Sequence, residues 1–280
     1  VSLIKRGNFI RLAPYMVRAL ADMTKRHRLQ ADKLLWRAVS DGAERFDTEY
    51  DIAVAYLEGA STYYVADHVR AKRKVTFLHV DYEKAGYTRY LDIGAYSAFD
   101  KVFAVSDEVK SSFLRVYPEC ADVTEVFHNI LDKEYILENA EAGGGFEDDF
   151  EGIRILTVGR LDPQKALEIS VEAMELLRGQ TDTDIRWYVL GEGPERARLR
   201  ALITKKGLER DFVLCGAVPN PYPYMKQADI YVHASRFEGK SIAIQEAQIL
   251  GKPMIVSDTS GNREQVNNGV DGLMCGLNAK

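Results

Sequence analysis

Cysteine is scarce in this chain, which has three cysteines among 280 residues, Cys120, Cys215 and Cys275. A disulfide framework needs more cysteines, and no C-x-x-C spacing marks a zinc site. The acidic residues likewise form no cluster with the spacing of metal ligands. We therefore expect a protein of the reducing cytoplasm without a bound metal.

Long apolar runs and an excess of positive charge are also missing. No apolar stretch approaches the roughly 18 residues that a membrane-spanning helix needs, and the first residues lack the apolar core of a signal peptide. Lysine and arginine number 37 against 42 aspartates and glutamates, a net charge of −5. A general nucleic-acid binder normally carries a basic balance, so we expect no nucleic-acid partner.

The charge is uneven along the chain. Residues 1–40 hold nine lysines and arginines and two aspartates, a local excess of seven positive charges. Such a segment can face anionic lipid, which would make the protein peripheral at the inner face of the membrane. The alternative is a solvated helix face whose long cationic side chains lie along apolar surface.

What the sequence does contain is a regular alternation of strand-like and helix-like segments, in a chain long enough for two domains. Alternation of this kind predicts parallel sheets. The division is marked by residues 141–150, which are acidic and rich in glycine, a composition typical of a linker. We therefore predict domains at 1–140 and 151–280. Strands are expected at 51–57, 74–80, 101–105 and 123–127 in the first and at 153–158, 185–190, 212–214, 230–232, 254–256 and 272–275 in the second.

The most informative stretch is residues 237–247, which place two carboxylates eight positions apart. A predicted strand precedes it and another follows, so the segment forms a strand-loop-helix-strand unit. Glu238 falls in the loop beyond the carboxyl end of a parallel strand, where ligands bind in open α/β sheets. Glu246 falls about one and a half turns into the helix and can reach the same crevice.

This pattern resembles the E-x7-E signature of retaining glycosyltransferases with the two-domain GT-B fold, family four in the usual classification. The similarity covers essentially all of residues 151–276 and is weaker upstream, at 77–82 and 105–109. Further motifs stand in the family's order: Val158-Gly159-Arg160-Leu161 followed by Lys165, Leu190-Gly191-Glu192-Gly193-Pro194-Glu195, Gly216-Ala217-Val218-Pro219-Asn220-Pro221 and Ala228-Asp229-Ile230.

The resemblance implies an α/β protein with two Rossmann-like βαβ domains that face a central cleft. The first domain would hold the acceptor, and the second would bind the donor, a nucleoside-diphosphate sugar that serves as co-substrate with no further cofactor. The family's opening strands and closing helices find no counterpart here. We therefore expect an incomplete first domain and a chain that is truncated at both ends relative to the family.

Two cations are placed to hold the donor diphosphate. Arg160 follows a predicted strand, and Lys165 follows a turn in which Asp162-Pro163 starts a helix, so both lie at the carboxyl edge of the sheet. Arginine grips phosphate through two parallel hydrogen bonds and lysine acts as a point charge. By resemblance these two would neutralise the leaving diphosphate without a metal. The alternative is an exposed basic loop.

The two glutamates match the donor-binding positions of the family. By resemblance Glu238 contacts the donor sugar, and Glu246 accepts hydrogen bonds from the ribose hydroxyls. The backbone amides of Gly239, Lys240 and Ser241 open the helix between them, where the N–H groups and the helix dipole favour an anionic or hydroxyl-rich ligand.

The remaining predicted site residues come from three further segments. His79 ends a strand of the first domain and resembles the family's histidine that approaches the transferred sugar, although a buried core histidine explains it equally well. Gly191 and Glu192 would line the donor site, and the segment around Val218 would contact the base. A Rossmann dinucleotide fingerprint is excluded because Arg196 stands where it requires glycine.

The function that follows is transfer of a hexose, with retention of configuration, to a hydroxyl of a polysaccharide or lipid-linked saccharide. Two alternatives remain: a sugar-nucleotide epimerase of the same fold, and a non-catalytic module that binds nucleotide sugars or a protein partner. A glycosidase with Glu238 and Glu246 as its carboxylate pair is a weaker interpretation, because a hydrolase needs no phosphate-binding cations.

Overall fold

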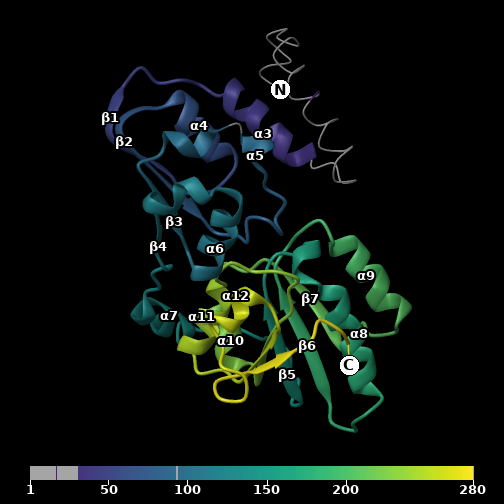
Figure 1. The fold of residues 1–280 in the computed structure, drawn as a ribbon. Helices are drawn as coiled ribbons and strands as arrows, with labels where there is room; N and C mark the ends of the chain where they lie inside the picture. The colour runs from purple at the N-terminus through teal and green to yellow at the C-terminus, as the bar shows by residue number, and fades with distance from the viewer. Residues whose placement is uncertain (1–16, 18–30, 93, 280) are drawn as a thin grey trace. The chain divides into compact units, whose positions relative to one another are not determined.

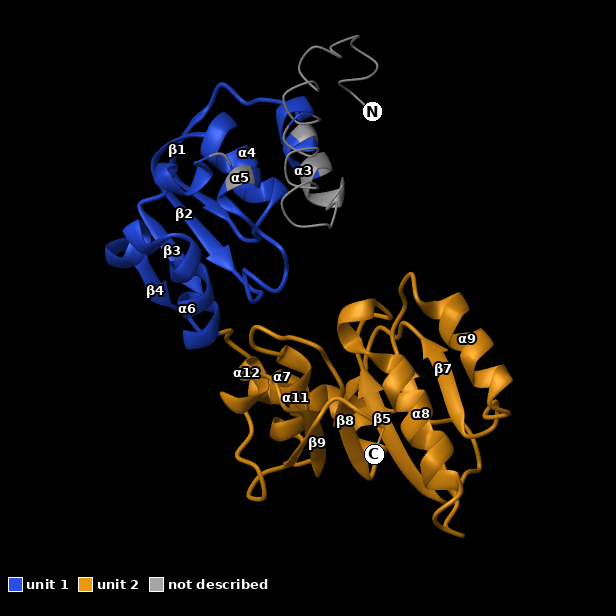
Figure 2. Cartoon of the chain, turned by 45° about the vertical axis from the view of Figure 1, so that its right-hand side comes forward, with its two compact units in different colours: residues 1–128 blue, residues 129–280 orange. Residues whose placement is uncertain are grey.

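The computed structural model describes residue 17, residues 31–92 and residues 94–279 (Figure 1). The chain divides into two compact units, Val1–His128 and Asn129–Lys280 (Figure 2). Most of the basic segment 1–40 therefore lies outside the described residues. Both units alternate strands and helices, and every strand pair in them is parallel. The predicted α/β class is confirmed.

Unit 1 is built on a four-stranded sheet in the order β1-β2-β3-β4. Its strands are β1 (Glu49–Ala55), β2 (Arg70–Leu78), β3 (Lys101–Ala104) and β4 (Thr124–Val126), close to the predicted positions. The helices of the described part are α3 (Ala31–Gly42), α4 (Ala60–His68), α5 (Arg89–Asp92) and α6 (Asp107–Val116), with 3-10 turns η2 (Ala95–Ala98) and η3 (Pro118–Val123).

The core of unit 1 contains a buried carboxylate that the sequence did not reveal. Asp92 is fully buried and accepts hydrogen bonds from the hydroxyl groups of Tyr63 at 2.7 Å, Tyr82 at 2.6 Å and Tyr117 at 2.8 Å. Burial raises the pKa of Asp92, and the three hydroxyl donors partly offset that rise. A buried polar group is tolerated when its hydrogen bonds are satisfied, so we assign this cluster a structural role.

Unit 2 is built on a six-stranded sheet in the order β10-β9-β8-β5-β6-β7. The order reverses beside β5, which pairs with β6 on one side and with β8 on the other. The strands are β5 (Ile153–Val158), β6 (Ile185–Leu190), β7 (Phe212–Gly216), β8 (Ile230–His233), β9 (Met254–Ser257) and β10 (Leu273–Cys275). The helices are α7 (Lys133–Ala140), α8 (Leu167–Arg178), α9 (Arg196–Lys205), α10 (Tyr222–Gln227), α11 (Ile242–Ile249) and α12 (Ser260–Arg263), with the 3-10 turn η4 (Pro163–Lys165).

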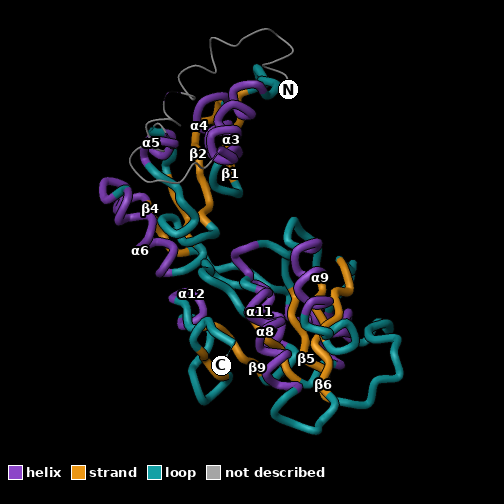
Figure 3. The backbone as a smooth tube through the Cα atoms, turned by 90° about the vertical axis from the view of Figure 1, so that its right-hand side faces the viewer, coloured by secondary structure: helices purple, strands orange, loops and turns teal. Residues whose placement is uncertain are grey.

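Alternate residues of these strands face opposite sides of the sheet, as a pleated strand requires. Helices α8 and α9 cover one face and α10 and α11 cover the other (Figures 1 and 3). The apolar strand side chains on the first face include Ile155, Trp187 and Val232, and those on the second include Leu156 and Tyr231. Helices on both faces explain why the strands read as nearly continuous apolar runs.

The division between the units differs from the predicted boundary at 140, because helix α7 packs on α10 and belongs to unit 2. The glycine-rich segment 141–150 also makes hydrogen bonds and ion pairs with other parts of unit 2. The backbone N–H of Phe146 donates to Gln227 Oε1 at 2.8 Å, and Asp148 forms ion pairs with Arg154 at 2.8 Å and Arg186 at 2.9 Å. Gln227 and Arg186 are distant in sequence from this segment, so composition alone suggested a linker.

Candidate donor site

The loops that carry the predicted site residues of unit 2 meet at one edge of its sheet. Arg160 and Lys165 follow β5, Gly191 and Glu192 follow β6, and Glu238 follows β8. Because β5 is hydrogen-bonded to both β6 and β8, the three loops emerge side by side at the carboxyl ends of neighbouring strands. The order of the strands reverses here, which is the usual place for a ligand in an open α/β sheet.

The centre of this edge is a buried cluster of three side chains from three elements. Lys165 Nζ lies 2.6 Å from Glu238 Oε1, and His233 Nε2 lies 3.0 Å from the same oxygen. Lys165 Nζ is also 3.4 Å from His233 Nε2. The side chains of Lys165 and Glu238 are 16% and 8% exposed, and that of His233 is 1% exposed. The structure therefore pairs two predicted residues with a histidine that sequence reasoning did not select.

Burial and charge set the ionisation of this cluster. Burial raises the pKa of Glu238, but the hydrogen bond from His233 and the charge of Lys165 outweigh it and lower that pKa to about 2. Burial, together with the nearby ammonium group of Lys165, lowers the pKa of His233. At neutral pH the cluster is thus a carboxylate and an ammonium group beside a neutral imidazole.

The loop after β8 is held against the loop after β5 by several contacts. The backbone N–H of Arg236 donates to the Gln164 carbonyl at 2.8 Å, and Gln164 Nε2 donates to the Phe237 carbonyl at 2.8 Å. The Arg236 guanidinium group pairs with Glu168 on α8. These bonds place Glu238 and Lys165 before any ligand arrives, which is the preorganisation that a binding site needs.

Arg160 lies at the same edge but is not part of the buried cluster. Its side chain is 77% exposed and pairs with Asp162 at 2.9 Å. The two predicted diphosphate cations therefore differ, since one is a surface arginine and the other is a mostly buried lysine that already pairs with a carboxylate. Glu192 is half-exposed and forms an ion pair with Arg196 on α9.

Gly191 allows the backbones of neighbouring loops in the site to approach one another. It has a φ of 148°, and a Cβ atom built on it would lie 1.9 Å from the Gly159 carbonyl oxygen. Its own N–H donates to the Gly216 carbonyl at 2.8 Å. Only glycine allows the loops after β5, β6 and β7 to approach so closely. Val218, just after β7, packs against the core on the α10–α11 face.

Glu246 projects from α11 and is half-buried. The Tyr222 hydroxyl donates to Glu246 Oε1 at 3.0 Å. Burial raises the pKa of Glu246, and that hydrogen bond partly offsets the rise. The carboxylate keeps acceptor capacity on Oε2, which suits a diol. Sequence reasoning missed Tyr222, because its partner lies on another helix.

Gly239, Lys240 and Ser241 form the predicted helix entrance, and Ser241 is the N-cap residue of α11. The Gly239 carbonyl oxygen would lie 2.3 Å from a Cβ atom at Gly261, so α12 backs this loop closely. The loop therefore has a fixed backbone beside Glu238, as expected for a site that presents amide N–H groups.

His79 follows β2 and belongs to unit 1, whereas the residues above belong to unit 2. Its backbone N–H donates to Glu58 Oε2 at 3.0 Å, and its ring lies 5.2 Å from the Tyr56 ring. Its Nδ1 atom is buried without a hydrogen-bond partner in the described part of the chain. The His79 ring is half-buried at the carboxyl end of a parallel strand, which is the position that the sequence predicted. Its role beside the transferred sugar stays a prediction.

Two other features are not part of this edge. Asp41, Asp67 and His68 of unit 1 place ligand atoms within 4.8 Å of one another. These groups have partners nearby, because Arg37 pairs with Asp67 at 2.8 Å and His68 Nε2 lies 3.0 Å from Asp41 Oδ1. We therefore interpret this group as a contact between α3 and α4.

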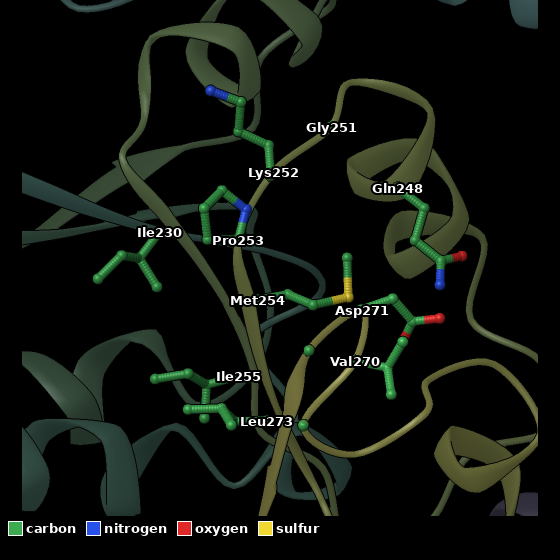
Figure 4. Close-up of a pocket in the computed structure, with 12 residues that line it drawn as sticks. Ile230, Gln248, Gly251, Lys252, Pro253, Met254, Ile255, Val270, Asp271 and Leu273 are labelled. Carbon is green, nitrogen blue, oxygen red and sulfur yellow. The ribbon is translucent and has the colours of Figure 1, made fainter.

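A pocket of ≈ 730 Å³ opens at the amino-terminal ends of β8, β9 and β10, where Met254, Ile255 and Leu273 line it (Figure 4). The predicted site residues lie at the opposite, carboxyl ends of the strands. None of them lines this pocket.

Residues 148–279 match the family described as glycosyl transferases group 1. One relative is the N-acetylgalactosamine-N,N'-diacetylbacillosaminyl-diphospho-undecaprenol 4-alpha-N-acetylgalactosaminyltransferase of Campylobacter jejuni. It is 34% identical over 151 residues, which are 54% of this chain and 39% of that protein. Another is the UDP-Gal:alpha-D-GlcNAc-diphosphoundecaprenol alpha-1,3-galactosyltransferase of Escherichia coli, 34% identical over 43% of this chain and 32% of that protein. The matches thus span about a third of these relatives.

Among solved structures, the chain is similar to Anabaena Alr3699/HepE in complex with UDP and glucose. The TM-score is 0.67 at 18% identity, over 88% of this chain and 67% of that one. The pneumococcal O-GlcNAc transferase GtfA in complex with UDP and GlcNAc has a TM-score of 0.61 at 17% identity, over 88% and 49% of the two chains. These likenesses confirm the predicted GT-B fold class. In the part of this chain that the structure describes, no helix has the length and apolar character to cross a membrane.

Proposed function

We propose that the protein is a retaining glycosyltransferase that moves a hexose from a nucleoside-diphosphate sugar to a hydroxyl of a polysaccharide or lipid-linked saccharide. The observation that carries this proposal is the buried Lys165–Glu238–His233 cluster at the reversal point of the unit 2 sheet. A carboxylate held in place there suits sugar hydroxyls, and a lysine beside it suits a diphosphate. The match of residues 148–279 to the glycosyl transferases group 1 family supports the same assignment.

The donor is proposed to be a UDP-sugar. Two of the similar structures hold UDP with a sugar, and the Escherichia coli relative carries UDP-Gal in its name. Glu246 would accept hydrogen bonds from the ribose hydroxyls while Tyr222 orients it. Arg160 and Lys165 would balance the charge that develops on the diphosphate as the sugar leaves, which requires no metal.

The acceptor and the location follow from the relatives and the charge. The names of both curated relatives include a diphospho-undecaprenol acceptor. A cytoplasmic protein whose basic segment 1–40 touches anionic lipid would meet such an acceptor at the membrane surface. His79 would approach the transferred sugar from unit 1.

The first experiment is a thermal-shift titration of the chain with UDP, GDP, ADP and their hexose conjugates, because a ligand that binds only the folded state raises the melting temperature by mass action. We expect a dose-dependent rise with UDP and its conjugates that Glu246→Ala abolishes. Glu172→Ala is the matched control, since Glu172 is exposed on α8. A flat response to every nucleotide would contradict a donor site.

Turnover then separates the proposal from its alternatives. With a lipid-linked or polysaccharide acceptor, we expect Arg160→Ala and Lys165→Ala to reduce kcat more than nucleotide affinity. Product that forms from the UDP-sugar alone, as an epimerised sugar, would favour an epimerase instead. Nucleotide binding with no product in either assay would favour a non-catalytic module.

A further inference from the structure

We propose that His233 is a positioning residue of the donor site, which holds one oxygen of Glu238 so that the other oxygen is presented to the donor sugar. This inference rests on the proposed function. His233 ends β8 and is five residues before Glu238, so the strand and the loop it leads into supply both partners of the hydrogen bond.

The two oxygens of Glu238 have unequal surroundings. Oε1 accepts from Lys165 Nζ at 2.6 Å and from His233 Nε2 at 3.0 Å. Oε2 has one contact among the described residues, with Gln164 Nε2 at 3.5 Å, which is at the limit of a hydrogen bond. A carboxylate has about four acceptor positions, so Oε2 keeps capacity for a sugar hydroxyl.

The tautomer of His233 follows from its bond to Glu238. Because an ionised carboxylate only accepts hydrogen bonds, this bond requires the proton of the neutral ring to lie on Nε2. Nδ1 is then an acceptor, and the Tyr231 hydroxyl, 3.3 Å away on the other side of the ring, can donate to it.

Lysine alone would not orient the carboxylate in this way. An ammonium group on a flexible stem acts as a point charge and follows whichever anion is nearest, including an arriving diphosphate. The His233 ring is fully buried at the end of a strand and cannot follow. When Lys165 moves toward the diphosphate, His233 would therefore keep Glu238 in place.

The test compares two substitutions and two ligands by isothermal titration. His233→Gln places an amide N–H near the position of Nε2, whereas His233→Phe keeps a ring and removes the donor. UDP and the best-binding UDP-hexose are the probes. We expect His233→Phe to reduce the preference for the UDP-hexose over UDP by about tenfold, with UDP affinity within about twofold of the unsubstituted chain, and His233→Gln to restore most of that preference.

Ser235→Ala is the matched control, because Ser235 is equally buried after the same strand and its hydroxyl lies 3.4 Å from Ser257 Oγ, away from Glu238. Equal losses of affinity for UDP and UDP-hexose in His233→Phe would overturn the inference, since they would indicate a merely structural role. Equal behaviour of the phenylalanine and glutamine variants would overturn it as well.

A second measurement needs no ligand and separates this inference from the proposed function. The chain has five histidines, so the imidazole nitrogens can be observed by ¹H–¹⁵N NMR, with His233→Gln identifying the signals of His233. We expect a neutral ring protonated on Nε2 in the free chain and a change of its Nε2 shift in Glu238→Gln. A ring protonated on Nδ1 would overturn the inference even if nucleotides bind. Failure of all nucleotides to bind, with the expected tautomer present, would refute the proposed function and with it the presentation of Oε2 to a sugar.

Discussion

Replacement of Lys165 by methionine removes the one cation that pairs with the Glu238 carboxylate among the described residues, and it keeps an unbranched side chain that is one atom shorter. Removal of one partner of a buried ion pair costs about 3–5 kcal/mol, because the other charge stays buried without compensation. Two features reduce the loss here. Lys165 is 16% exposed, and His233 still donates to Glu238 at 3.0 Å. We therefore expect a loss of about 2–3 kcal/mol in the free energy of unfolding of unit 2.

The two tryptophans allow unit 2 to be observed by itself. Trp187 is buried on β6 and its indole N–H donates to Thr157 Oγ1 at 3.0 Å, while Trp36 belongs to unit 1. In a Trp36→Phe background, fluorescence during thermal unfolding reports unit 2 alone. At about 2–4 °C per kcal/mol for a domain of this size, the melting temperature should fall by roughly 5–10 °C.

Lys205→Met is the matched control, because Lys205 is exposed on α9 and should change the melting temperature little. The double variant Lys165→Met, Glu238→Gln removes both charges and should regain part of the lost stability. A fall of less than about 2 °C in Lys165→Met, or a double variant that is no more stable than the single one, would refute the buried-pair argument.

The remaining predictions concern pH, the ribose, the backbone and unit 1. The folded-state pKa of Glu238, about 2, lies below its ordinary value of 4.5. Its contribution to the free energy of unfolding, roughly 3 kcal/mol, is therefore present above pH 4.5 and is lost as the pH falls toward 2. Acid unfolding of unit 2 that is unchanged by Glu238→Gln would contradict this. Glu246→Gln should weaken UDP binding by about 10- to 100-fold in calorimetry, since a charged acceptor for two hydroxyls is lost, and an unchanged affinity would exclude the ribose contact. Gly191→Ala should destabilise unit 2 in the fluorescence assay far more than Gly251→Ala. Gly251 also has a positive φ, +64°, but no atom lies within 4 Å of a Cβ added to it. Equal effects would show that the close approach of Gly191 to the Gly159 carbonyl is unimportant. His79→Ala should reduce kcat and leave UDP affinity unchanged, and a parallel loss of affinity would point to a structural role.

Much of the fold was predictable because strands and motifs are local. The predicted strands are all present, and β5 and β6 have the expected bounds. An apolar run between turn residues identifies a buried strand wherever it packs. The segment 141–150 is held by Gln227, Arg154 and Arg186. Its composition does not reveal the contacts with Gln227 and Arg186, because folding brings these distant residues to it.

The period of the apolar residues, the spacing of the motifs and the residue types were enough to predict the parallel α/β class and the likeness to glycosyltransferases, and to select Lys165, Glu238 and Glu246 as candidates. How these groups act on one another depends on the folded structure. Folding packs the mostly buried Lys165 against Glu238, leaves Arg160 in solvent and brings His233 to the same carboxylate oxygen. The reason is physical: ionisation and orientation depend on burial and on neighbours from other strands, and the strand order of the sheet sets both.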